Sequence, residues 1–209
     1  MKNFVFITSL ILLLAISLQY GCSQSGNIST TTTTTIGIHD VTIPVQQSTY
    51  ADENQPSTVC YAAPIHYSGY WDFFGGYSTS GYIQFDVAII PATANILSAN
   101  LNLYILQVPG VNTTIYFYNL ASSWNETNLS FNFNRPSISG SSIAAKVFST
   151  TDSGWISIDI TDCVKQWVNG SVTNNGLNLA SLNTTQWNAI MYYSKASSVN
   201  QPKLEVTYQ

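Results

Sequence analysis

Aromatic side chains crowd one short stretch of this sequence. Residues 65–77 read Ile-His-Tyr-Ser-Gly-Tyr-Trp-Asp-Phe-Phe-Gly-Gly-Tyr, with glycines between the rings. Aromatic planes stack on the apolar C–H faces of sugar rings, and a neighbouring polar group takes hydrogen bonds from the hydroxyls. We therefore predict a carbohydrate-contacting loop with these candidate residues: Tyr67, Tyr70, Trp71, Asp72 and Tyr77. In the alternative interpretation, Trp71, Phe73 and Phe74 fill the protein core.

Carboxylates are the other groups that could do chemistry. Hydrolysis of a glycosidic bond needs two placed carboxylates, and no local motif unites Asp52, Glu53, Asp72 and Glu126. Neither of the two histidines lies in a metal-ligand spacing, and no Gly-x-Ser-x-Gly motif occurs. We predict no catalytic residue and no required cofactor. Asp52 and Glu53 are candidate ligands for a structural Ca²⁺, which prefers oxygen donors; simple solvation at the surface is the alternative.

The chain begins with an export pattern. An almost unbroken apolar run from Phe4 to Leu18 follows a single lysine. The run is shorter than the roughly 20 residues of a bilayer span, and it predicts a signal peptide over residues 1–21. Cys22 ends this pattern and is the predicted lipidation site, with ordinary cleavage or an uncleaved anchor as alternatives. Residues 22–38 are polar and threonine-rich, which predicts a flexible tether. We expect a secreted, cell-surface protein that meets the membrane only through this anchor.

The three cysteines suggest one disulfide. If Cys22 carries lipid, Cys60 and Cys163 remain as a pair in an oxidising compartment. Their bond would close a loop of about 100 residues and stabilise the fold by about 4–5 kcal/mol in the chain-entropy view. Two buried free thiols are the alternative.

Charge is sparse and excludes one class of partner. The sequence has six basic residues against ten acidic ones, for a formal net charge of −4. Nucleic-acid binding needs clustered lysine and arginine, and the bases here are scattered. We therefore predict no nucleic-acid partner, and the same scatter disfavours strongly anionic polysaccharides.

Several asparagines stand in the Asn-x-Ser/Thr pattern of glycosylation sites. These candidates are Asn27, Asn112, Asn125, Asn128, Asn169 and Asn183. A chain rich in asparagine and threonine also makes such patterns by chance, so their use depends on the organism.

Alternation of apolar and polar residues predicts strands along residues 39–209, a single domain. The predicted strands are 81–87, 96–106, 114–118, 155–160, 189–193 and 204–208. Thr161 to Val168 departs from this pattern because Val164, Trp167 and Val168 recur at helical spacing. Thr161 is the expected N-cap, and Asn169-Gly170 the stop. One short helix among many strands predicts an all-β fold, an antiparallel β-sandwich or jelly roll.

Some polar and aromatic residues adjoin these elements. Five of them are interpreted as turn, capping or packing groups rather than ligand contacts: Asp86, Trp124, Glu126, Asp159 and Trp167. Arg135, which precedes a proline, is expected to pair with an acid such as Glu126.

Four sequence blocks occur in a specific order. They are Tyr82–Asp86 with Ile90-Pro91 and Ile96–Tyr104, Ser123–Thr127 with Asn134–Pro136, Asp159–Trp167 with Asn175–Leu177, and Pro202–Tyr208. Together they resemble the DNRLRE domains of archaeal and bacterial surface proteins, which are disaggregatase-related jelly rolls similar to carbohydrate-binding modules. The resemblance spans about Asp40 to Tyr208. It implies a jelly-roll fold and an association with carbohydrate or the cell envelope.

Two functions fit these observations. The first is a non-catalytic, surface-anchored carbohydrate-binding module whose partner is a polysaccharide or glycoprotein of the cell envelope. The second is a structural or adhesive envelope protein that self-associates in a layer, filament or matrix without free-sugar specificity. A shared fold does not transfer function, so the sequence leaves both open.

Overall fold

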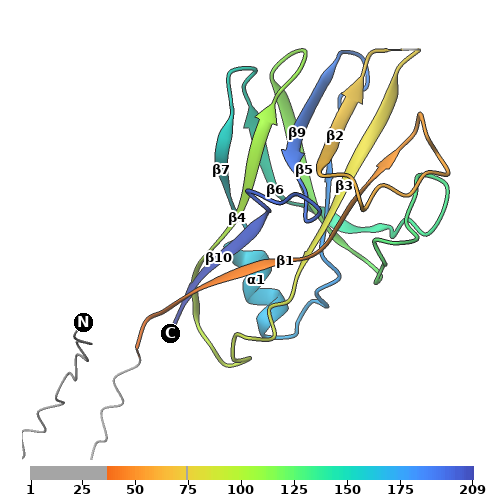
Figure 1. Cartoon of the computed structure of the whole chain (residues 1–209). Coiled ribbons are helices and arrows are strands. Elements are labelled where there is room, and N and C mark those ends of the chain that lie inside the picture. The colour runs from red at the N-terminus through yellow and green to blue at the C-terminus, as the bar shows by residue number, and fades with distance from the viewer. Residues whose placement is uncertain (1–36, 74) are drawn as a thin grey trace, which may run out of the picture. The chain divides into compact units, whose positions relative to one another are not determined.

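The computed structural model describes residues 37–73 and 75–209. The predicted signal peptide, the tether up to residue 36, Cys22 and Asn27 lie outside these residues. The elements within them are β1 (His39–Asp52), β2 (Ile65–Trp71), β3 (Tyr77–Phe85), β4 (Ile96–Gln107), β5 (Thr113–Leu120), β6 (Ile138–Phe148), β7 (Gly154–Asp159), α1 (Thr161–Val168), β8 (Leu177–Ala180), β9 (Asn188–Tyr193) and β10 (Lys203–Tyr208). Figure 1 shows this arrangement.

Every strand pairing in the described part of the chain is antiparallel, which confirms the predicted β-sandwich. The pairings β1-β3-β2-β9-β4-β10-β1 form a closed circuit. From this circuit β8, β5 and β6 extend beyond β3, and β7 extends beyond β4.

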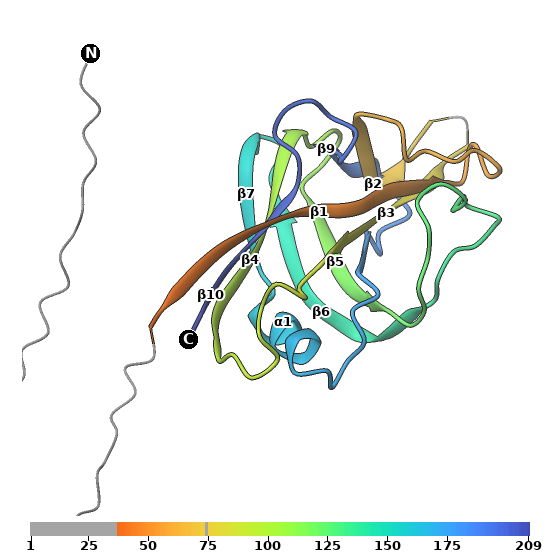
Figure 2. The ribbon, with the colours of Figure 1, turned by 60° about the horizontal axis from the view of Figure 1, so that its bottom comes forward.

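Strand β1 pairs with two different strands. Its first half, His39–Pro44, pairs with β10, and its second half pairs with β3. The change of partner falls at an irregularity between Val45 and Gln47, where an extra residue lets a strand bend. Figures 1 and 2 show β1 running from β10 toward β3 and β2.

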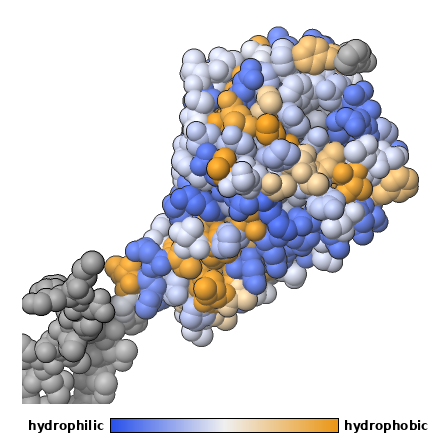
Figure 3. All heavy atoms as spheres, viewed as in Figure 1, coloured by the Kyte–Doolittle hydropathy of each residue, from blue (hydrophilic) through white to orange (hydrophobic). Residues whose placement is uncertain are grey.

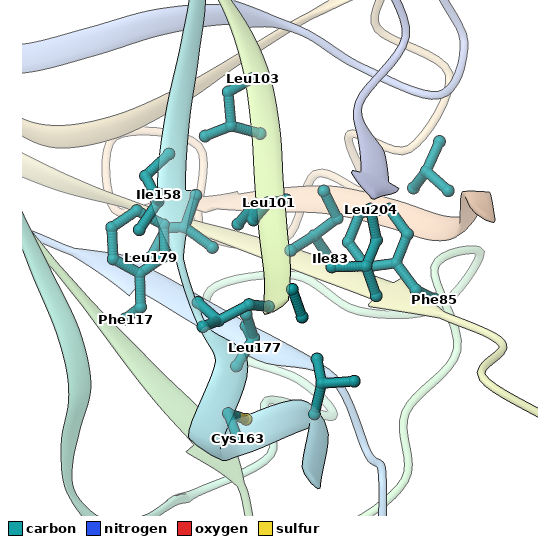
Figure 4. Close-up of a cluster of buried hydrophobic side chains, with 14 of the residues drawn as sticks. Ile83, Phe85, Leu101, Leu103, Phe117, Ile158, Cys163, Leu177, Leu179 and Leu204 are labelled. Atoms are coloured by element: carbon teal, nitrogen blue, oxygen red, sulfur yellow. The ribbon is translucent and has the colours of Figure 1, made fainter. Parts of the chain in front are cut away.

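The main core lies between the sheets. It consists of the inward-facing residues of alternating strand positions, including Phe85, Leu101, Phe117, Leu177 and Leu204 (Figure 4). Each of these five side chains is fully buried. Burial of such groups stabilises a fold by about 1.5–3 kcal/mol per side chain before the entropy of ordering is subtracted, so this core suffices to position a site without a cofactor.

Helix α1 covers one end of the sandwich, as predicted (Figure 2). It buries Val164, Trp167 and Val168 against the core. The expected N-cap was wrong: Thr161 is the first helical residue, and Ile160 occupies the cap position without a side-chain hydrogen bond. Instead, Asp159 Oδ1 accepts hydrogen bonds from the backbone N–H and hydroxyl of Thr161, at 2.8 and 2.6 Å. These bonds lower the pKa of Asp159.

The motif residues have the structural roles that the sequence suggested. Trp124 is buried, and its Nε1 donates to the carbonyl of Asn175 at 2.8 Å. Trp167 Nε1 donates to Asn119 Oδ1 at 3.1 Å. Asp86 Oδ1 accepts a hydrogen bond from the backbone N–H of Ala88.

The expected Arg135–Glu126 pair does not form. Arg135 Nε donates to the hydroxyl of Tyr82 at 3.2 Å, and its guanidinium lies 4.4 Å from the ring centre of Phe131. Glu126 pairs with Lys195 and accepts the backbone N–H of Ser48. Each charge therefore fixes a different loop against the sandwich.

The predicted disulfide is also wrong. Cys60 and Cys163 are both buried free thiols. Cys163 lies on α1, in the main core beneath Leu177 (Figure 4), and its Sγ donates to Asn119 Oδ1. Cys60 lies in the β1–β2 connection, outside that cluster, and contacts the carbonyl of Thr58. The two sulfurs therefore lie in different surroundings. Burial raises the pKa of both thiols.

Reduction is therefore expected to leave stability unchanged. Thermal melts with and without dithiothreitol should superimpose, because no cross-link restrains the unfolded chain. A Cys60–Cys163 bond would instead make the reduced protein about 4–5 kcal/mol less stable. A marked fall in melting temperature on reduction would contradict the free-thiol assignment.

Candidate functional site

A hollow of about 280 Å³ opens on the sheet formed by β1, β3 and β2. Five of its lining residues are strand residues with aromatic or hydroxyl side chains, and an acid and an amide complete it. We call it the Asp52 pocket, and it is lined by Tyr50, Asp52, Gln55, Tyr67, Trp71, Tyr77 and Thr79.

Strand register brings these residues together. In antiparallel strands, directly opposite residues project from the same face, and so do residues two apart along a strand. Asp52 lies opposite Thr79, and Trp71 lies opposite Tyr77. Tyr50 is two residues before Asp52, and Thr79 is two residues after Tyr77, so three strands supply one continuous lining.

Four of the seven lining residues are aromatic. The planes of Trp71 and Tyr77 are nearly parallel, 11° apart, with ring centres separated by 6.4 Å. Tyr67 stands edge-on to Trp71 at 5.4 Å and to Tyr50 at 5.1 Å. These mutual contacts hold the rings in place before any ligand arrives, so binding needs little reordering of the site.

Polar atoms complete the pocket. Thr79 Oγ1 accepts a hydrogen bond from Trp71 Nε1 at 3.1 Å, which fixes the indole. Asp52 is only 6% exposed, and its Oδ1 accepts the backbone N–H of Asn54 at 2.8 Å. Burial raises the pKa of Asp52 and, together with the Asp52 charge, that of Tyr77. The pocket thus combines flat apolar surface with one strong hydrogen-bond acceptor.

The structure brings together three of the five predicted sugar-contacting residues, Tyr67, Trp71 and Tyr77. Tyr70 and Asp72 do not line the pocket. Tyr70 packs over Gly76, whose missing Cβ leaves room: an added Cβ would lie 1.8 Å from the Tyr70 hydroxyl. Asp72 is exposed in the turn after β2.

The predicted loop is largely a strand. Residues 65–71 form β2, which pairs with both β3 and β9. Gly69 permits this close pairing, because an added Cβ would meet the carbonyl oxygen of Asn188 on β9 at 2.2 Å. The core-filling alternative is wrong for Trp71 and Phe73: Trp71 is half-buried, Phe73 is 42% exposed, and neither belongs to a core cluster. Phe74 lies outside the described residues.

Phe73 and Trp187 extend the aromatic surface beside the pocket. Their ring centres lie 4.6 Å apart with an edge-to-face geometry, and Trp187 also approaches Trp71 at 5.9 Å. Trp187 precedes β9, so a residue more than 100 positions along the chain supports the β2 aromatics.

Four other hollows are larger: two, of about 550 and 310 Å³, have no aromatic lining residue, and the two that a tryptophan lines lack accessible aromatic planes. The hollow of about 590 Å³ beside α1 includes Trp167, and the one of about 440 Å³ near Arg135 includes Trp124. Both indoles are at least nine-tenths buried, and their Nε1 groups donate to protein acceptors. These tryptophans pack the fold, whereas Trp71 in the Asp52 pocket is half-buried.

Asp52 and Glu53 point to different partners. Glu53 is exposed and accepts the backbone N–H of Ser78 at 2.8 Å, whereas Asp52 faces the pocket. Within residues 37–73 and 75–209, no three His, Cys, Asp or Glu side chains gather in a way that could hold a metal ion. Calcium binding by this pair stays a prediction.

The glycosylation candidates that the structure describes are all exposed, namely Asn112, Asn125, Asn128, Asn169 and Asn183. Figure 3 shows hydrophobic residues on the viewed face as separate patches among hydrophilic ones. The described residues contain no helix with the length and apolar character needed to cross a membrane.

Replacement of Asp52 by asparagine is expected to stabilise the free protein at neutral pH. The pKa of Asp52 is raised above its ordinary value of 3.8 by burial, so the folded protein holds this proton more tightly than the unfolded chain does. The carboxyl's contribution to stability is therefore greatest below pH 3.8 and falls as the pH rises through the folded pKa. Asparagine does not ionise, and it keeps an acceptor for the Asn54 N–H.

Thermal melts at several pH values test this expectation. The melting temperature of the Asp52→Asn protein should rise relative to that of the wild type as the pH increases from about 3 to about 7. Melting curves that keep the same separation at every pH would contradict the burial of an ionised carboxylate at this position.

One sequence comparison identifies the family of the domain. Residues 39–208 match carbohydrate-binding module family 96. No curated protein sequence matches the chain. The family match covers all ten strands and α1, and so includes every residue of the Asp52 pocket.

Proposed function

We propose that this chain, which belongs to carbohydrate-binding module family 96, binds a glycan in the Asp52 pocket without cleaving it. The observation that carries the proposal is the convergence of Tyr67, Trp71 and Tyr77 around a buried carboxylate. Aromatic planes take the apolar faces of sugar rings, and the carboxylate accepts hydrogen bonds from hydroxyls. These are the two demands that a sugar makes on a protein surface.

The lining of the pocket supports binding without cleavage. Glycoside hydrolysis uses two carboxyl groups about 5–9.5 Å apart, one on each side of the scissile bond. Asp52 is the only carboxyl group among the seven lining residues. The pocket therefore serves to recognise a glycan. The chain acts by holding that glycan near the structure to which the chain itself is attached.

A glycan array followed by calorimetric titration tests the proposal. We expect micromolar-to-millimolar binding to at least one glycan, and Asp52-pocket variants should lose it. Absence of binding across neutral and acidic glycans, with a correctly folded protein, would overturn the proposal. Self-association in light scattering under the same conditions would then favour a structural envelope role.

The place of action that we propose is the cell surface. The support is the N-terminal sequence pattern, with its apolar run, Cys22 and threonine-rich segment. A polysaccharide or glycoprotein of the envelope is the corresponding partner, as the resemblance to DNRLRE domains also implies. Mass spectrometry of the membrane fraction should find a mature N-terminus at lipid-modified Cys22. An unmodified N-terminus in the culture medium would contradict anchoring but leave glycan binding intact.

A further inference from the structure

We infer that Asn125 and Asn183 are N-glycosylation sites of this protein, and that Asn112, Asn128 and Asn169 are not. The co-substrate is a polyprenyl diphosphate-linked oligosaccharide, whose sugar is transferred to the side-chain nitrogen of asparagine. All five asparagines are exposed and stand in the Asn-x-Ser/Thr pattern, so neither exposure nor this pattern separates them. The hydrogen bonds around each motif do separate them. This modification is distinct from the proposed glycan binding, because none of these asparagines lines the Asp52 pocket.

The side chain of Asn183 is held by its own glycosylation motif. Its Oδ1 accepts hydrogen bonds from the backbone N–H and the hydroxyl of Thr185, at 3.0 and 2.9 Å. The backbone N–H of Asn183 donates to Ser181 Oγ, and its carbonyl accepts a hydrogen bond from Asn188 Nδ2, both at 3.1 Å. In the described part of the chain, no acceptor engages Asn183 Nδ2. The nitrogen that receives the sugar is therefore the unengaged polar atom of an exposed residue.

A buried anchor sets this arrangement. Asn188 is fully buried, and its Oδ1 accepts hydrogen bonds from Ser181 Oγ at 2.6 Å and from Thr113 Oγ1 at 3.2 Å. Its Nδ2 donates to the carbonyl of Asn183. These bonds tie the connection between β8 and β9 to β5, so the fold itself presents Asn183 at the surface.

Asn125 repeats this geometry in the connection between β5 and β6. Its Oδ1 accepts hydrogen bonds from the backbone N–H and the hydroxyl of Thr127, at 2.9 and 2.8 Å. The residue between them, Glu126, is fixed by its ion pair with Lys195 and by the backbone N–H of Ser48. No described residue accepts a hydrogen bond from Asn125 Nδ2, so this nitrogen is available in the same way.

Hydrogen bonds to Oδ1 matter because of the chemistry of sugar transfer. The side-chain nitrogen forms a bond to the anomeric carbon of the sugar, and the bond from that carbon to the diphosphate oxygen breaks. The diphosphate leaves with the electron pair, and Nδ2 loses one proton to a base of the transferring enzyme. The negative charge that develops as the proton leaves is shared with Oδ1, and donors already aimed at that oxygen stabilise it. Asn125 and Asn183 each have two such donors.

Asn112 and Asn169 lack this arrangement. Asn112 Oδ1 accepts the backbone N–H of Thr150, a residue outside its motif, at 2.9 Å. Asn169 Oδ1 accepts the backbone N–H of Ser171 at 2.9 Å, but the Ser171 hydroxyl donates to the carbonyl of Gln166 instead. Among the described residues, each of these two oxygens therefore has one donor rather than two.

Asn128 fails for a different reason. The hydroxyl of its motif belongs to Ser130, which is only 1% exposed and whose Oγ is buried. A transferring enzyme that recognises the motif through this hydroxyl cannot reach it in the folded protein.

Site occupancy in the native protein tests this assignment. The full-length chain is purified from its source cells, digested with a protease and analysed by tandem mass spectrometry for sugar on each asparagine. We expect occupancy at Asn125 and Asn183 to be at least about fivefold higher than at the other three sites, because one hydrogen bond to a developing charge is worth about that factor in rate.

Two controls separate geometry from sequence. Asn112 already has threonine two positions after it, as Asn183 does, so low occupancy there does not come from a weaker motif. Ser171→Thr gives Asn169 a motif of the same kind and should leave its occupancy low. Thr185→Ala should remove the sugar from Asn183 and leave the other sites as they are.

The possible outcomes are distinct. Occupancy of Asn112 or Asn169 equal to that of Asn183 would mean that the motif alone decides modification, and would overturn the inference. Absence of sugar from either Asn125 or Asn183 would overturn it as well. Neither result bears on the Asp52 pocket, because calorimetric titration tests glycan binding there separately.

Discussion

Truncation of Trp71 to alanine is expected to weaken glycan binding about 30-fold, corresponding to a loss of about 2 kcal/mol. The indole presents one of two nearly parallel faces in the Asp52 pocket, and four other aromatic rings hold its position. Its removal takes away the stacking surface and also leaves the Thr79 hydroxyl without its indole partner. Calorimetric titration with the tightest array ligand measures the change.

Trp155 provides the matched control for this experiment. It is 43% exposed on β7, which pairs with β4 and does not line the pocket. Trp155→Ala removes an equally large exposed ring and should leave affinity unchanged. Trp71→Phe should fall between wild type and alanine, because it keeps an aromatic face and loses the hydrogen bond to Thr79. Equal glycan affinity of Trp71→Ala and wild type would contradict glycan binding in the Asp52 pocket.

The second large effect is expected in the core. Phe117→Ala should lower the free energy of unfolding by about 3–5 kcal/mol, since a fully buried phenyl ring leaves a cavity when it is removed. For a domain of this size, each kcal/mol corresponds to about 2–4 °C. The melting temperature should therefore fall by about 6–20 °C in differential scanning calorimetry.

Val147 on the neighbouring strand β6 is the control for Phe117. Its side chain is 62% exposed, and Val147→Ala should change stability by no more than about 0.5 kcal/mol. Phe117 lies on β5, outside the pocket, so its alanine variant should still bind glycan at low temperature. A melting temperature within about 2 °C of wild type would contradict the buried position of Phe117.

The regular elements were predictable where one face is buried and the other is solvated. Strand β7 alternates exposed positions with less exposed ones, and β10 alternates partly buried with buried positions over most of its length, so the period-two pattern was visible in the sequence. The position and the last residue of α1 were also predicted correctly, because Val164, Trp167 and Val168 recur at helical spacing. Its cap was misassigned: Thr161 does not cap the helix with its hydroxyl, and instead donates hydrogen bonds to Asp159 from its backbone N–H and hydroxyl.

Strands that are buried on both faces were harder to recognise. The second half of β1 ends in five consecutive buried residues, so it shows no alternation. Among these residues, the hydroxyl of Thr49 has no hydrogen-bond partner in the described part of the chain. Strand β2 contains Gly69 and several aromatic residues, and this composition is typical of a loop. Recognition of β2 as a strand would have placed Tyr70 on the opposite face from Tyr67 and Trp71, because neighbours along a strand alternate.

The pocket itself could be predicted only in part. Trp71, Tyr67 and Tyr77 are close in sequence and share one aromatic segment. Asp52 joins them through its pairing with Thr79, which is set by the register of β1 on β3. Local sequence carries no signal for that register, because it depends on how the whole length of β1 packs. Asp52 was therefore assigned to calcium, and its place in the pocket emerged from the structure alone.

The double pairing of β1 has a mechanical consequence. Its first half is held by β10, and its second half, which carries Tyr50 and Asp52, is held by β3. Tension applied where the chain enters β1 and resisted by a glycan held in the pocket would run along the axis of this strand. Interstrand hydrogen bonds are perpendicular to that axis, so the pull loads many of them together in shear rather than opening them one by one. Strand β1 thus provides a direct path for force between the start of the domain and the proposed glycan site.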